Sequence, residues 1–210
     1  MKNGVSIILV MLLVVFPLVS YFFLKGGLNF FQKTYDEITP KGELPPTLLE
    51  AVDTQGRVLR IPEDSVYLIT MAMVYAGEEN ENFRRIDTMA HNLNHAFNAD
   101  RSGLQKPLDF FLFVNEELMP LADSLLGKRP YIRLAPSSMS ELRTLGINLG
   151  ILTRESDPRN FMVLSDQVGR VRQVYLSFDP PTQREVYKHA SILIPAPIKK
   201  DIIFEREKEL

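Results

Sequence analysis

Cysteine and tryptophan are both absent from this sequence of 210 residues. Without cysteine the chain can form no disulfide, carry out no thiol redox reaction and offer no thiolate to a metal ion. Lysine and arginine number 24 against 26 for aspartate and glutamate, which leaves a formal charge of −2. This near-neutral balance gives no support for nucleic-acid binding, because nucleic-acid-binding proteins carry a basic stripe.

Charged residues are also missing from the first long apolar run, Val5–Leu24. A helix needs about 20 apolar residues to cross a hydrocarbon core of roughly 30 Å. A cleaved signal peptide is the competing interpretation, but the run is longer than a usual signal-peptide core and no small-residue cleavage pattern follows it. We therefore expect residues 1–25 to form an uncleaved transmembrane signal anchor, with Pro17 tolerated as a kink.

The orientation of this span rests on a small asymmetry. Lys2 precedes the span while Lys25 and Lys33 follow it, so the positive-inside rule is nearly balanced. The very short leading segment favours an N-terminus in the cytoplasm. The sequence thus predicts a single-pass protein of the inner (cytoplasmic) membrane, with its C-terminal domain on the extracytoplasmic, or periplasmic, side.

Three segments are expected after the anchor. Residues 26–46 have the mixed composition of a juxtamembrane linker, and residues 47–197 are long enough for one domain with a single core. Residues 198–210 form a charged tail that contains an apolar patch at Ile202–Phe204. Such a tail is either a frayed end or a docking peptide.

A strand, a loop and a helix are predicted at the centre of the domain. The apolar, β-branched run Val66–Met73 predicts a buried strand, and residues 74–79 predict a loop. Asn80 or Asn82 is then expected to cap a helix over Phe83–Phe97, whose apolar residues recur at spacings of three to four.

The other predicted elements alternate in the same way. A hairpin comes first, then a second strand, a short helix ending at Gly127, a short strand, a helix opened by the capping box of Ser138 and Glu141, a strand pair, and a last helix stopped by prolines. The hairpin is expected at 48–61, the second strand at 108–114, the short helix within 115–126 and the short strand at 131–134. The helix with the capping box is expected at 138–145, the strand pair at 161–175 and the last helix at 183–194. This order implies an α/β domain with a mixed sheet and helices on its faces.

Three stretches of the chain resemble the Sco (cytochrome-oxidase assembly) branch of the thioredoxin-like superfamily. They are the entry hairpin at 48–61, the strand from Val66 into its loop and helix, and the strand–turn–strand at 161–175. The likeness covers roughly residues 44–194. It implies one membrane span followed by an extracytoplasmic thioredoxin-like domain, in which Pro158 lies about where many such folds place a cis-proline.

The resemblance also locates a metal site that this sequence lacks. The family binds copper through two cysteines of a CxxxC loop and a histidine shortly before the late strand. The loop falls near Ala76–Asn82 and the histidine near Asp157–Pro158, and none of the three ligands is present at these positions. No catalytic, cofactor-binding or metal-binding residue can therefore be carried over from the family.

Two other patterns offer metal-ligating atoms. His91 and His95 lie one helical turn apart, close enough to share an ion, but off the predicted buried stripe. Met71 and Met73 occupy the same face of a strand, and their thioethers suit Cu(I), whereas methionine in a buried strand usually fills the core. A solvated helix face and a packed strand are the simpler interpretations of the two pairs.

The retained scaffold and the missing thiols together predict a function without catalysis. We expect a membrane-anchored thioredoxin-like domain that acts as an interaction or assembly subunit of an envelope complex, such as a respiratory oxidase complex. It is expected to be no enzyme, to need no cofactor, to bind no nucleic acid and to have a protein partner in the membrane. The alternative is a copper- or other metal-handling protein that uses histidine and methionine in place of cysteine.

Overall fold

The computed structural model divides the chain into two compact units, Met1–Thr39 and Pro40–Leu210. The described residues are 2–45, 56, 69–75, 79–98, 107–154 and 159–194, with the backbone alone described for 2–10, 69–75 and 79. Three sequence predictions therefore lie outside the described residues: the hairpin at 48–61 apart from Gly56, the position of Pro158, and the tail at 198–210.

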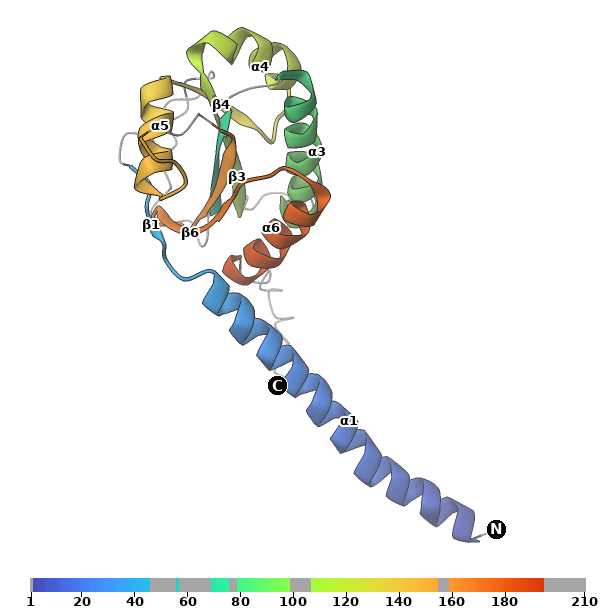
Figure 1. Cartoon of the computed structure of the whole chain (residues 1–210). Helices are drawn as coiled ribbons and strands as arrows, with labels where there is room; N and C mark the ends of the chain where they lie inside the picture. Colours follow the sequence, from blue (N-terminus) through green and yellow to red (C-terminus); the bar gives the residue numbers. More distant parts are fainter. Residues whose placement is uncertain are drawn as a thin grey trace, which may run out of the picture. The chain divides into compact units, whose positions relative to one another are not determined.

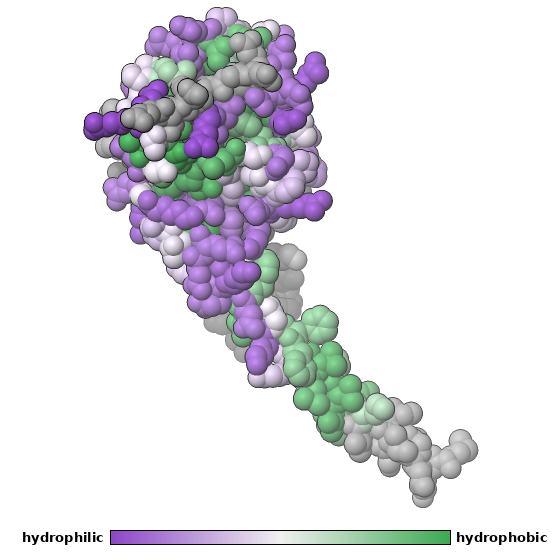
Figure 2. All heavy atoms as spheres, in the orientation of Figure 1, coloured by the Kyte–Doolittle hydropathy of each residue, from purple (hydrophilic) through white to green (hydrophobic). Residues whose placement is uncertain are grey.

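The first unit is one long helix, α1 (Lys2–Glu37), drawn in blue in Figure 1. Residues Met11–Glu37 of this helix are long and apolar enough to cross a membrane. Its large side chains are exposed, among them Phe16 and Phe23, and hydrophobic residues cover the middle of the helix in Figure 2. Because exposed apolar surface is unfavourable in water, such a helix fits a single-pass membrane anchor.

The helix is longer than the predicted span. It continues through Gly26 and Gly27 to Glu37, so most of the segment predicted as a juxtamembrane linker is helical. A glycine costs only about 1 kcal/mol relative to alanine in a helix interior, which is too little to end a helix that has good formers on both sides. The hydroxyl of Thr34 donates to the carbonyl of Phe30 over 2.8 Å in the last turns of the helix.

The second unit is built on a six-stranded sheet in the part of the chain that the structure describes, with the strand order β1-β6-β5-β2-β3-β4. The strands are β1 (Gly42–Glu43), β2 (Ile69–Tyr75), β3 (Leu108–Asn115), β4 (Arg133–Ser137), β5 (Phe161–Ser165) and β6 (Arg170–Tyr175). Strands β2, β3 and β4 run parallel, whereas β5 lies antiparallel to both β2 and β6.

The helices of this unit include those that cross between its parallel strands, as parallel pairing requires. They are α3 (Glu79–Asn98), the short 3-10 helix η1 (Glu116–Leu118), α4 (Met119–Leu126), α5 (Met139–Asn148) and α6 (Pro180–Leu193). Helix α3 crosses from β2 to β3, and η1 with α4 crosses from β3 to β4. The hairpin β5–β6 then leads into α6. This arrangement is that of the thioredoxin-like fold, and it confirms the predicted fold class.

Two apolar cores lie on the two faces of the sheet. Phe110 and Leu112 of β3 pack in the core that α3, α4 and α6 cover, while Phe111 and Phe113 pack in the core that α5 covers. Alternate residues of a strand point to opposite faces, so a strand at the sheet centre is apolar at nearly every position. Figure 1 shows α5 on the opposite side of the sheet from α3 and α6.

Two predicted helix starts are wrong. Helix α3 begins at Glu79, so Asn80 and Asn82 lie in its first turn and neither caps it. Helix α6 begins at Pro180 rather than Gln183, because Asp179 is its N-cap and accepts a hydrogen bond from the amide of Thr182 over 2.9 Å. An N-cap aspartate followed by proline at the first helical position is a start signal in its own right.

Two other local predictions are confirmed, whereas the predicted bounds of one strand are wrong. Ser138 and Glu141 form the complete capping box of α5, and Gly127 is the C-cap of α4. Strand β4 is displaced from the predicted 131–134, since its parallel pairing with β3 continues to Ser137. Pro136 can lie inside β4 because this strand is at the edge of the sheet formed by the described residues, where a missing N–H costs no ladder bond.

Candidate functional site

The N-terminus of α3 is the place where the sequence resemblance puts the missing metal-binding loop. It follows the carboxyl end of β2, and ligands of open α/β sheets usually bind beyond the carboxyl ends of the strands. Residues 76–78, in the expected loop, and residues 157–158, at the expected histidine position, lie outside the described residues. In the first turns of α3, Glu81 is exposed and forms an ion pair with Arg85 one turn along the helix. Such surface pairs are worth little and require no ligand.

His91 and His95 are both exposed on α3, as the sequence predicted for residues off the buried stripe. The ring of His91 packs edge-on against Tyr131, with 5.7 Å between the ring centroids. Among the described residues, no group of three or more histidine, aspartate or glutamate side chains is placed to hold a metal ion. The described part of the fold therefore adds no third ligand to the histidine pair.

Met71 and Met73 lie in β2, between β3 and β5. Met71 is in register with Phe110 and Leu164, and Met73 with Leu112 and Met162, all four of which are buried in one core. This register supports the interpretation of the two positions as core positions in the centre of the sheet. It does not bring them together with the histidines of α3.

A polar network connects α3 to the segment before β4. The phenol of Tyr131 donates to Oδ1 of Asp87 over 2.8 Å, and the guanidinium of Arg129 donates to Oδ2 over 2.6 Å. Burial and then the hydrogen bond with Asp87 raise the pKa of Tyr131, so the phenol remains a neutral donor. Nothing local in the sequence marked Asp87, because its partners follow more than forty residues later.

A second polar cluster closes the β5–β6 turn, where the sequence predicted only a turn. Oδ2 of Asp166 accepts hydrogen bonds from Nε of Arg170 and Nε of Arg172, at 2.8 and 2.9 Å. Burial opposes ionisation of Asp166, but the hydrogen bonds from Arg172 and Arg170 outweigh it and lower the pKa of this carboxyl. Gly169 in the turn has a φ of 78°, which favours glycine. The cluster is accounted for by the geometry of the hairpin.

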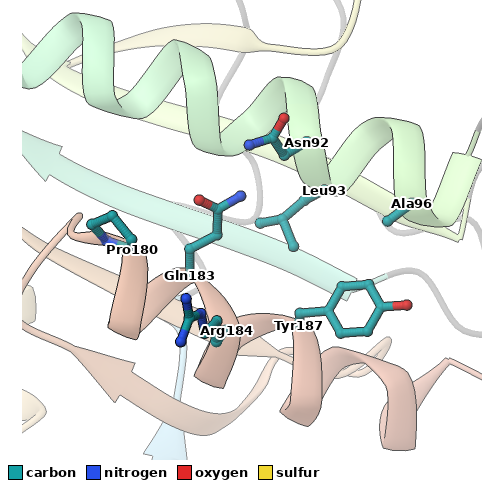
Figure 3. Close-up of a pocket in the computed structure, with 7 residues that line it drawn as sticks. All are labelled: Asn92, Leu93, Ala96, Pro180, Gln183, Arg184 and Tyr187. Carbon is teal, nitrogen blue, oxygen red and sulfur yellow. The ribbon is translucent and has the colours of Figure 1, made fainter.

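A groove of about 410 Å³ runs between α3 and α6 (Figure 3). Its lining is mostly apolar and consists of Asn92, Leu93, Ala96, Pro180, Gln183, Arg184 and Tyr187. Leu93 is buried at the floor, while Tyr187 is 50% exposed and its ring lies 5.1 Å from that of Phe97. Among the described residues, the lining of the groove includes no thiol, carboxylate or imidazole.

No family model and no curated protein matches the chain. Among solved structures, a putative thiol:disulfide interchange protein DsbE from Chlorobium tepidum is 10% identical with a TM-score of 0.48, over 73% of this chain and 99% of that chain. A putative electron transfer protein from Aquifex aeolicus VF5 is 10% identical with a TM-score of 0.49, over 73% and 95%. BsSco, a member of the Sco family of cytochrome c oxidase assembly proteins, is 11% identical with a TM-score of 0.46, over 72% and 96%.

These similarities are too distant to transfer a function or a site. The fold assignment rests on the strand order and strand directions of the sheet itself.

Proposed function

We propose that this protein is a membrane-anchored, non-catalytic thioredoxin-like domain that acts as an interaction or assembly subunit of an envelope complex. One observation carries the proposal: a thioredoxin-like sheet stands in a chain that has no cysteine. Without a thiol, disulfide exchange, thiol peroxidase chemistry and copper transfer through cysteines are all closed to it. A fold that lacks its reactive groups still offers surfaces for recognition.

Helix α1 supports the anchoring part of the proposal. Its apolar side chains are exposed, and its apolar run is long enough to cross a membrane. The domain is proposed to lie on the extracytoplasmic side of the inner membrane. The resemblance to Sco proteins in residues 48–61 and 161–175 makes a respiratory oxidase complex the proposed setting.

Burial supports the non-enzymatic part of the proposal. The hydroxyl of Tyr175 lies 2.7 Å from Nδ1 of His189, a separation that would suit a catalytic pair. Tyr175 is only 4% exposed and His189 only 2% exposed, so this pair cannot reach a substrate in the folded protein.

Purification from membranes tests the subunit role. The full chain, tagged at its C-terminus, is solubilised at several detergent-to-protein ratios and captured, and co-purifying proteins are identified by mass spectrometry. We expect at least one membrane-complex protein to be captured at every ratio. An anchor-only chain of residues 1–39 with the same tag is the control and should not capture it. If the full chain migrates alone at every detergent level, the proposal is wrong.

A second candidate function is metal handling through histidine and methionine. The observation that favours it is the exposure of His91 and His95 one turn apart on the same helix. Titration with copper distinguishes the two proposed functions, because a non-catalytic interaction subunit has no need to bind a metal ion.

A further inference from the structure

The groove between α3 and α6 lies directly over the apolar core that these helices cover. Leu93 belongs to the core that α3 and α6 share, and it forms the floor where the two helices separate. Figure 3 shows Pro180 at one end of the groove and Tyr187 at the other, with Ala96 facing Tyr187. A hollow of this size with a mostly apolar lining is a typical place for an apolar side chain to bind.

We propose that this groove binds the C-terminal tail of the same chain through the apolar triplet Ile202–Phe204. The tail follows directly from α6, one wall of the groove. Tyr187 lies about 10 Å before the end of α6, because seven residues separate it from Ile194 at 1.5 Å each. The eight residues from Ile194 to Ile202 can span up to about 27 Å. The triplet therefore reaches the groove with chain to spare.

The composition of the tail matches the lining of the groove. Ile202, Ile203 and Phe204 are consecutive apolar residues in a segment that is otherwise mostly charged. Glu205 follows them immediately, and Arg184 lies exposed on the groove wall. The apolar triplet would pack on the apolar floor of the groove, and the carboxylate of Glu205 would pair with the guanidinium of Arg184.

Because the tail is covalently attached to α6, it can occupy the groove even if its intrinsic affinity for the groove is low. A short flexible connection holds a segment at an effective concentration of about a millimolar near its site. A triplet that would bind weakly as a free peptide is thus bound when it belongs to the chain. The inference goes beyond the proposed subunit role and does not depend on it.

Disulfide trapping tests the contact between the tail and the groove. Because the sequence has no native cysteine, only the introduced cysteines can cross-link. The full chain with Ala96→Cys and Asp201→Cys is oxidised mildly in detergent micelles, and the cross-link is quantified by mass spectrometry. The control pair is Thr144→Cys with Asp201→Cys, since Thr144 is exposed on α5 at the other face of the sheet. We expect the groove pair to cross-link within one chain roughly tenfold faster than the control pair. Adding Phe204→Asp should abolish this advantage.

Each other result would overturn the inference. Equal rates for the two pairs mean that the tail does not dwell in the groove. A cross-link only between two chains assigns the groove to the tail of a second copy. No effect of Phe204→Asp means that the triplet makes no contact there.

A second measurement introduces no cysteine, so its result does not depend on whether the cysteine variants fold correctly. Chemical nitration of Tyr187 is followed in the full chain and in a chain that ends at Ile194. Removal of the tail should raise the rate of nitration roughly tenfold, whereas nitration of exposed Tyr35 serves as the internal standard. An unchanged rate at Tyr187 contradicts the inference independently of the cross-linking.

Discussion

Tyr175 of β6 and His189 of α6 meet inside the core, with the phenol oxygen 2.7 Å from Nδ1 of the imidazole. Both side chains are buried, so each would otherwise leave a polar atom without water. Burial, and then the nearby charge of Glu185, raises the pKa of Tyr175, which keeps the phenol neutral. The hydrogen bond joins the last strand to the last helix, and so holds one wall of the α3–α6 groove on the sheet.

Removing this phenol should destabilise the fold. Tyr175→Phe leaves Nδ1 of His189 buried without this partner, which we expect to lower the free energy of unfolding by about 1–2 kcal/mol. Tyr187→Phe, on the exposed side of the same helix, should change it by less than about 0.5 kcal/mol. Urea unfolding of the full chain in detergent, followed by circular dichroism, measures both. Equal effects of the two substitutions would show that the buried contact contributes little.

The ion cluster of the β5–β6 turn should dominate the response of this hairpin to acid. The side chain of Asp166 is 11% exposed and is held between Arg170 and Arg172. Asp166→Asn removes the charge but keeps the shape, and we expect a loss of about 2 kcal/mol at neutral pH. Asp123→Asn, at an exposed position of α4, is the matched control and should be close to neutral.

The same variant should change the dependence of stability on pH. Because the pKa of Asp166 is lower in the folded state than its ordinary value of 3.8, its stabilising effect is complete above that value and is lost as the pH falls through the folded-state pKa. The stability difference between wild type and Asp166→Asn should therefore be constant near neutrality and shrink below pH 3.8. Urea titrations at a series of pH values measure this. A difference that persists undiminished in acid would mean that the charge of Asp166 is not its cause.

Copper should bind weakly if the subunit role is right. Calorimetric titration of the full chain in detergent with Cu(I) and with Cu(II) is expected to give no binding tighter than micromolar, because two imidazoles alone form an incomplete site. His91→Ala and His95→Ala should leave the titration unchanged. Tighter binding that either substitution removes would instead favour the metal-handling alternative.

Membrane anchoring should depend on the apolar run of α1. The full chain is expected to remain in the membrane pellet after alkaline carbonate extraction, and intact mass spectrometry should show residues 1–25 still attached. Leu18→Arg places a charge near the middle of the run, at a cost of about 3 kcal/mol, and should increase the extracted fraction. Gln32→Arg, beyond the run, is the control. A pelleted chain without residues 1–25 would point to a cleaved signal peptide.

Short-range features of the fold were predictable from neighbouring residues. The capping box of Ser138 and Glu141 lies within one turn, and the β5–β6 pair is separated only by a turn that contains Gly169. The buried stripe of α3 follows from the spacing of residues such as Phe83, Ile86 and Leu93. The start of α6 was missed although its signal, Asp179 before Pro180, is also local.

Composition and local pattern by themselves determined that this chain has an apolar span, a set of alternating strands and helices, and no thiol chemistry. Those properties depend on residues adjacent in the sequence or on counts of residue types. Only the tertiary structure decided that Leu93 and Tyr187 line one groove and that Asp87 holds Tyr131. Strand order places α3 and α6 on the same face of the sheet, and strand order is a long-range property that no local pattern encodes.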